Sequence, residues 1–182
     1  MQNLIRLLLV YLIIFSVPLS AQHLRLHDIP NVTLEDFKAP VKADAPYPVY
    51  MNVRVYYRID SVVKVSDNKF KLKVITKVEP DRQGSFFDRK KVPDHAIAGL
   101  LNHEKGHVVI GFICGNKITK QLSSKVYTSN YVAEVRESFH PLLRNLSDLH
   151  REYDEGSNHG MNKPEQKLWD RKLIDMFLAT FK

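Results

Sequence analysis

The stretch LLNHEKGHVVIGF, residues 101 to 113, constrains the fold of this chain more than any other. It is almost wholly apolar and therefore belongs in a core, yet it contains His103, His107 and, directly after the first histidine, Glu104. Unpaired polar groups are costly to bury, and the apolar flanks offer them few hydrogen-bond partners. A bound metal ion would explain why all three ionisable side chains are placed there.

The spacing within this stretch also defines a chemistry. In an α-helix, residues four apart lie on the same face, so His103 and His107 can offer two imidazole nitrogens to one ion. Glu104 lies one position further round the helix, where it can contact a water on that ion without binding the metal. In this HExxH arrangement, zinc lowers the pKa of its water and the glutamate accepts the proton as the water attacks a carbonyl. The alternative, two buried histidines satisfied by hydrogen bonds alone, is disfavoured by the apolar flanks.

A catalytic zinc site needs a third protein ligand, and it keeps its fourth position for water. The next expected helix carries two candidates, Glu134 and Glu137. The apolar periodicity of that helix turns Glu134 to the side and Glu137 away from the core. We therefore expect both carboxylates to be solvated.

The segment YDEGSNHG, residues 153 to 160, is the better source of the third ligand. A tight turn before Gly160 can aim the ring of His159 at the site, and a neutral imidazole is the ligand we expect. Asp154 is the alternative, either as the ligand itself or as an outer-shell carboxylate that holds a ligand's second nitrogen. Tyr153 either donates to the oxyanion of a tetrahedral intermediate or packs in the core.

The first 21 residues have the organisation of a secretory signal peptide. Arg6 supplies the positive charge, LLLVYLIIFSVPL is an apolar run, and Ala21 precedes the expected cleavage site. The run is shorter than the roughly 20 residues that a spanning helix needs, so an uncleaved anchor is the minor alternative. We expect an exported mature domain, residues 22 to 182, in the periplasm or outside the cell, with no transmembrane span.

Composition narrows the class of partner. The length of 182 residues suits one domain, and Cys114, the only cysteine, excludes an internal disulfide and is expected to be buried. A net charge of +7 would suit acidic envelope polymers or anionic substrates. The lysines are spread out, however, and in KFKLKVITK they alternate with apolar residues as on the wet face of a strand. No nucleic-acid-binding pattern is present, so the expected partner is a peptide or protein substrate.

Alternating apolar residues predict an antiparallel hairpin in the N-terminal half. From 49 to 59 the odd positions are apolar or aromatic, while Arg54 and Arg58 lie between them. A second strand is expected from about 70 to 78, and SDN at 66 to 68 supplies the turn between the two.

Helical periodicity follows in the C-terminal half. A helix from about 94 to 122 carries the HExxH pattern, a second from about 130 to 155 is kinked or divided at Pro141 and ended by Gly156, and a third begins near Pro164. The fold class is therefore α+β, with a small antiparallel sheet followed by an active-site helix and two further helices. The core positions expected on the last two helices are 132, 135, 139, 142, 146, 149 and 153, then Leu168, Trp169, Leu173, Met176 and Phe177.

Two motifs together resemble a known family. LLNHEKGH and YDEGSNHG, with Gln166 and Trp169 further on, are similar to the pattern of the bacterial domain-of-unknown-function family 922, which pairs HEQGH with YDxxTxHG and a later QxxW. TLEDFKAPV resembles that family's opening segment, and GSFF takes the place of its strand before the active-site helix. Leu34, Lys105 and Ser157 depart from the pattern without removing an expected ligand or base.

Members of that family are regarded as predicted secreted zinc-dependent proteases, so the resemblance implies a zincin-like fold. In such a fold the HExxH helix lies under a small sheet whose edge can pair with an extended peptide. The expected function is that of an exported zinc metallopeptidase, with ligands His103, His107 and His159, Glu104 as base, and Tyr153 and Asp154 in support. Two alternatives remain open: a zinc-stabilised envelope or partner-binding domain without turnover, and a metalloamidase acting on cell-wall peptides. The substrate and the oligomeric state are left open as well.

Overall fold

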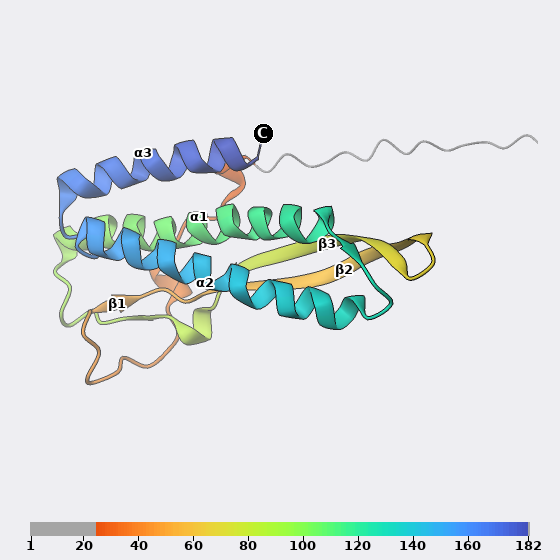
Figure 1. The fold of residues 1–182 in the computed structure, drawn as a ribbon. Helices are drawn as coiled ribbons and strands as arrows, with labels where there is room; N and C mark the ends of the chain where they lie inside the picture. The colour runs from red at the N-terminus through yellow and green to blue at the C-terminus, as the bar shows by residue number, and fades with distance from the viewer. Residues whose placement is uncertain (1–24, 182) are drawn as a thin grey trace, which may run out of the picture.

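Helix α1, Asp94–Ser124, runs through the centre of the protein (Figure 1). In the computed structural model, which describes residues 25–181, α1 packs against strand β3 (Lys69–Pro80) and against helices α2 (Tyr131–Ser157) and α3 (Lys163–Thr180). The fold is α+β, with two small antiparallel sheets and three α-helices in the described part of the chain. The signal peptide expected at residues 1–21 lies outside that part.

The larger sheet has the strand order β2-β3-β5. Strands β2 (Val53–Ser66) and β3 form a long antiparallel hairpin, and the short β5 (Val126–Tyr127) pairs with β3. Asp67 and Asn68 make the turn, where Asn68 adopts a φ of 53°, in the left-handed region that asparagine tolerates better than most residues. The predicted hairpin and its turn are therefore confirmed.

The predicted alternation of buried and exposed side chains is confirmed too. Val55, Leu72 and Val74 are buried on the face of the hairpin that meets α1, while Lys71 and Lys73 between them are exposed. Because side chains alternate between the two faces of a strand, one face of the sheet enters the core and the other carries the lysines.

Two glycines of α1 allow the hairpin to approach the helix backbone closely. A Cβ added at Gly111 would lie 2.7 Å from Val53 Cγ1, and one at Gly115 would lie 2.8 Å from Val78 Cγ2. Any larger residue at these two positions would push the strands away from the helix. Both glycines therefore allow α1 to pack closely on the sheet.

The expectation of one strand from 49 to 59 is wrong. The strand divides after Tyr50, so that β1 (Val49–Tyr50) pairs with β4 (Phe86–Phe87) in a separate two-stranded sheet, and β2 starts at Val53. At the break, the Asn52 N–H donates to Ser85 Oγ at 2.9 Å, and the Asn52 carbonyl accepts from the Asp81 N–H at 2.7 Å. The alternation of burial continues through the break, which is why periodicity did not reveal it.

Helices α2 and α3 differ from expectation in three details. First, of the kink or division expected at Pro141, the division is absent, because α2 continues through Pro141 as one helix. Second, α2 includes Gly156 and ends at Ser157, and the next residue, Asn158, caps it in the left-handed conformation with a φ of 50°.

Third, two residues expected in the core are exposed: Val132 is 63% exposed and Leu168 is 57% exposed. Val132 lies in the first turn of α2 and Leu168 in the second turn of α3, so the apolar pattern of both helices extends beyond the part that packs. Trp169, Leu173, Met176 and Phe177 do pack on the core, and Cys114 is buried and free.

The chain before the sheet is irregular, with two 3-10 turns, η1 (Leu26–Asp28) and η2 (Leu34–Asp36). A third turn, η3 (Arg82–Gly84), follows β3. Arg82 donates to Asp36 through Nε at 2.9 Å, which fastens this N-terminal arm to the loop after the hairpin. Within residues 25–181, no helix is both long and apolar enough to cross a membrane.

Candidate metal centre

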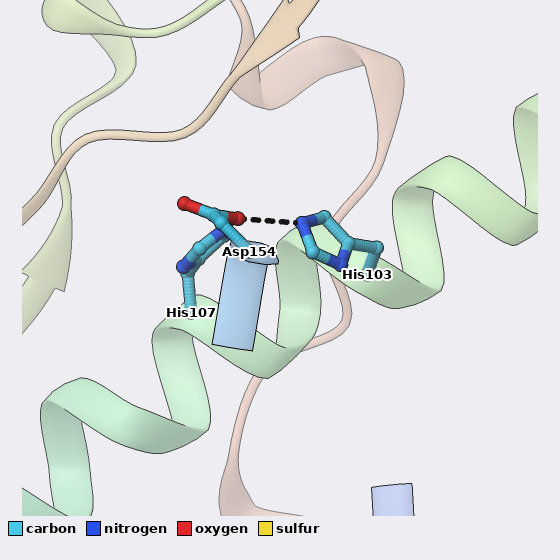
Figure 2. Close-up of side chains that lie close together, drawn as sticks. All are labelled: His103, His107 and Asp154. Carbon is cyan, nitrogen blue, oxygen red and sulfur yellow. Dashed lines mark hydrogen bonds and ion pairs between the residues drawn. The ribbon is translucent and has the colours of Figure 1, made fainter. Parts of the chain in front are cut away.

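Three side chains from two helices converge on one point, as Figure 2 shows. His103 and His107 project from the same face of α1, one turn apart, and are only 1% and 7% exposed. Asp154 enters from the last turn of α2, and its Oδ1 lies 3.0 Å from the Nε2 of each histidine. One ligand atom from each residue lies within 4.8 Å of the other two, so the three can hold one metal ion.

The spacing of these atoms fits a small divalent ion. Zinc bonds of about 2.0 to 2.1 Å at tetrahedral angles place neighbouring ligand atoms about 3.3 Å apart. Both histidine nitrogens lie near that separation from the Asp154 oxygen. Two imidazoles and one carboxylate are also a donor set that zinc accepts in proteins.

Glu104 lies beside this cluster and is 3% exposed. Its Oε2 is buried and has no hydrogen-bond partner among residues 25–181. Burial raises the pKa of the Glu104 carboxyl group, and the nearby His107 and His103 only partly oppose that effect. A carboxylate whose proton affinity is raised in this way is a stronger base than an exposed glutamate, which suits a group that accepts a proton.

A hydrogen bond to Gln166 fixes the orientation of the His103 ring. Its Nδ1 lies 3.0 Å from Gln166 Oε1, on α3. The Gln166 amide NH₂ donates to the Tyr153 hydroxyl and to Asp170 Oδ1, both at 2.7 Å, so Oε1 is left as the acceptor. A neutral His103 ring then carries its proton on Nδ1, which leaves the Nε2 lone pair for a metal.

Tyr153 supports the helix that carries the histidines. It is fully buried, its ring stacks on that of His103, and its hydroxyl donates to the His103 carbonyl at 3.1 Å. The hydroxyl also fills the space above Gly106 that a Cβ would need. Because the hydroxyl proton of Tyr153 is already donated to the His103 carbonyl, the geometry favours the packing role for Tyr153 over the alternative, donation to an oxyanion.

Asp154 is held as a carboxylate. In the metal-free protein, burial alone would raise its pKa, but protonated His103 and His107 donate to it from Nε2, and these hydrogen bonds with their charge outweigh burial and lower the pKa well below the ordinary value. A ligand carboxyl group must be ionised to bind a metal. The electrostatics therefore agree with Asp154 as a ligand.

His159 lies at the rim of the cluster. Its Nδ1 is 3.6 Å from Asp154 Oδ1, and the ring stacks on Tyr47 with 3.5 Å between centroids. Its backbone N–H donates to the Asp154 carbonyl at 2.8 Å. Asn158, His159 and Gly160 all have positive φ values, of 50°, 51° and 77°, so the chain makes a tight left-handed turn here. The expected tight turn is present, yet it brings Asp154 closer to the two α1 histidines than His159, and the third-ligand role of His159 stays a prediction.

Other residues clarify the choice of ligands. Glu134 accepts from the Thr128 N–H at the start of α2, Glu137 is exposed, and neither belongs to the cluster. Sequence reasoning missed His150, whose Nδ1 lies 2.7 Å from His107 Nδ1. Burial, followed by the neighbouring His107, lowers the pKa of His150 to about 3, so this ring is neutral. The available signal was its spacing, because His150 lies four residues, or one helical turn, before Asp154.

The fold and the site together define an α+β protein with a candidate metal centre between two helices. The chain matches the family described as "Bacterial protein of unknown function (DUF922)" over residues 25–160 and belongs to that family. No curated protein and no solved structure matches it significantly. The matched range includes the HExxH helix and all of α2, whereas α3, which supplies Gln166, follows it.

Proposed function

We propose that this protein is an exported zinc-dependent metallohydrolase, and that it is an endopeptidase with a zincin-like active site. The observation that carries the proposal is the state of Glu104. A buried carboxylate oxygen without a hydrogen-bond partner costs about 1 to 3 kcal/mol or more, and it lies beside two histidines that face a common point. A site that only binds metal does not need this carboxylate, whereas a hydrolytic site does.

Each residue of the site has a proposed role in metal binding or proton transfer. His103, His107 and Asp154 would hold the ion, and Gln166 keeps the His103 ring oriented towards it. A bound zinc ion supplies Lewis acidity and lowers the pKa of a coordinated water to about 7. Glu104 takes a proton at its free Oε2 and returns it to the leaving amine nitrogen.

The proposed location rests on the sequence. Residues 1 to 21 have the pattern of a secretory signal peptide, so the mature domain would act in the periplasm or outside the cell. A peptide or protein is the proposed substrate, because amide hydrolysis is the reaction most associated with a glutamate in the HExxH pattern.

A second function is favoured by one observation. His159 Nδ1 lies 3.6 Å from Asp154 Oδ1, close to the spacing of two ligands of one ion. With His159 as a fourth protein ligand the coordination would be closed, which is typical of structural zinc sites. In that case the protein would be a zinc-stabilised binding domain without turnover.

The deciding experiment compares three forms of the mature chain, residues 22 to 182: wild type, Glu104→Gln and Glu155→Gln. Glu155 is a matched control because it is exposed and follows Asp154 directly. Zinc content is measured together with cleavage of casein, a peptide library and cell-wall peptides. We expect one zinc per chain in all three forms, and a loss of cleavage of about 100-fold or more in Glu104→Gln alone.

The other results are equally informative. Cleavage by Glu104→Gln at the wild-type rate would show that Glu104 is not the base. Zinc binding by the wild type with no cleavage of any substrate would favour the binding domain. Cleavage restricted to cell-wall peptides would identify an amidase. A wild-type protein that binds no zinc would remove the metal centre itself.

A further inference from the structure

Both ring nitrogens of His107 are engaged. Nε2 faces Asp154 Oδ1 at 3.0 Å, and Nδ1 lies 2.7 Å from Nδ1 of His150. The His107 and His150 rings are tilted by 41° with 4.9 Å between centroids, which is a hydrogen-bonding rather than a stacking arrangement. His150 and Asp154 lie one turn apart on α2, so this helix presents both groups to the same histidine.

The direction of this hydrogen bond follows from counting protons. A neutral imidazole has one N–H, and two nitrogens 2.7 Å apart can share only one proton. If His107 Nε2 is to bind a metal, its proton must be on Nδ1. His107 is then the donor, and His150 must accept at Nδ1 and carry its own proton on Nε2.

We propose that His150 is a positioning residue of the metal centre, which accepts the Nδ1–H of His107 and thereby aims the Nε2 lone pair of His107 at the ion. Gln166 does the same for His103 with its amide oxygen. One partner comes from α2 and the other from α3, so each ligand of α1 is oriented by a different helix. The inference rests on the metal centre of the proposed function but not on hydrolysis.

The inference is tested by two substitutions at position 150. His150→Phe keeps a ring and removes the acceptor, whereas His150→Asn keeps an acceptor, because asparagine Oδ1 is as far along the side chain as histidine Nδ1. The matched control is His140→Phe, an exposed histidine on the same helix. Zinc affinity is measured by competition with a chromogenic chelator, without any substrate.

We expect His150→Phe to weaken zinc binding about 10- to 100-fold, as removal of such outer partners typically does. His150→Asn should recover most of that loss, and His140→Phe should bind as the wild type does. A merely structural role would instead lower the thermal stability of the metal-free protein without separating the Phe and Asn variants in affinity. Wild-type affinity in folded His150→Phe would overturn the proposal.

A second measurement does not depend on the variants folding. Nitrogen-15 NMR of the zinc-loaded wild type reports which nitrogen of each histidine carries the proton. We expect a protonated Nδ1 on His107 and a protonated Nε2 on His150, and a proton on Nδ1 of His150 would overturn the proposal. A wild type that binds zinc with this tautomer pair but cleaves nothing would refute the hydrolase and leave the role of His150 intact.

Discussion

The two halves of α1 are buried by opposite means. From Val108 to Leu122 the buried residues of the helix are apolar or small, and they pack against the hairpin, which approaches the helix at Gly111 and Gly115, and against α2 and α3. Around His103 and His107 the same helix buries ionisable groups in a network that reaches α2 and α3. Burial of apolar side chains stabilises a helix without any specific partner, whereas each buried polar group needs a hydrogen-bond or metal partner of its own. The stability of the first half of α1 should therefore depend on bound metal, and the stability of the second half should not.

The largest effect is expected from a cavity in the apolar half. Ile113 is fully buried, so Ile113→Ala should lower the free energy of unfolding by about 2 to 5 kcal/mol. Urea unfolding of the metal-free and zinc-loaded forms measures it, and the loss should be the same in both. Ile174→Ala, at a position 39% exposed on α3, is the control and should cost much less. A loss confined to the zinc-loaded form would contradict the independence of the two halves.

Removal of a ligand should affect only the metal half. Asp154→Ala takes away the oxygen that lies 3.0 Å from both ligand nitrogens, so zinc affinity should fall by more than the roughly 100-fold that outer partners account for. His159→Ala should cost less, because that ring lies 3.6 Å from Asp154 and outside the group of three. Calorimetric titration with zinc gives both values. The reverse order of losses would make His159 the third ligand.

Removal of the metal should change hydrogen exchange differently in the two halves of α1. At free zinc about 100 times the dissociation constant, binding stabilises the folded state by about 2.7 kcal/mol. Chelation should therefore speed amide hydrogen exchange around residues 101 to 108 and 150 to 160, where the network is held together by the ion. Exchange around residues 113 to 122 should change little where these amides exchange through local openings that leave the metal site folded. An equal change in both regions would show that α1 opens as one unit.

The smallest effect is expected from the outer partner of His103. Gln166→Leu removes the acceptor 3.0 Å from His103 Nδ1 and should weaken zinc binding about 10- to 100-fold. Chelator competition measures the loss, with Gln121→Leu at an exposed position of α1 as the control. An unchanged affinity in Gln166→Leu would mean that packing alone orients the His103 ring.

Several features follow from local sequence because they depend on local geometry. The spacing of His103 and His107 places them on one face of any α-helix, and the alternation around Val55 and Val74 places them on one face of any strand. These parts of the fold and of the site were predicted correctly. The break at Asn52 was not, since it depends on partners about 30 residues away, Ser85 and Asp81.

The third member of the candidate metal centre was decided by tertiary structure. Asp154 and His159 are only five residues apart, and sequence gave no measure of which one faces α1. The rotation of α2 against α1, together with a turn of three left-handed residues after it, brings Asp154 to both histidines and leaves His159 at the rim. The same rotation presents His150 to His107. Helical spacing by itself placed His103, His107 and Glu104 together on α1. Only the packing of α2 and α3 on α1 decided which side chains complete and orient this candidate site, because distances between helices depend on contacts that no local pattern encodes.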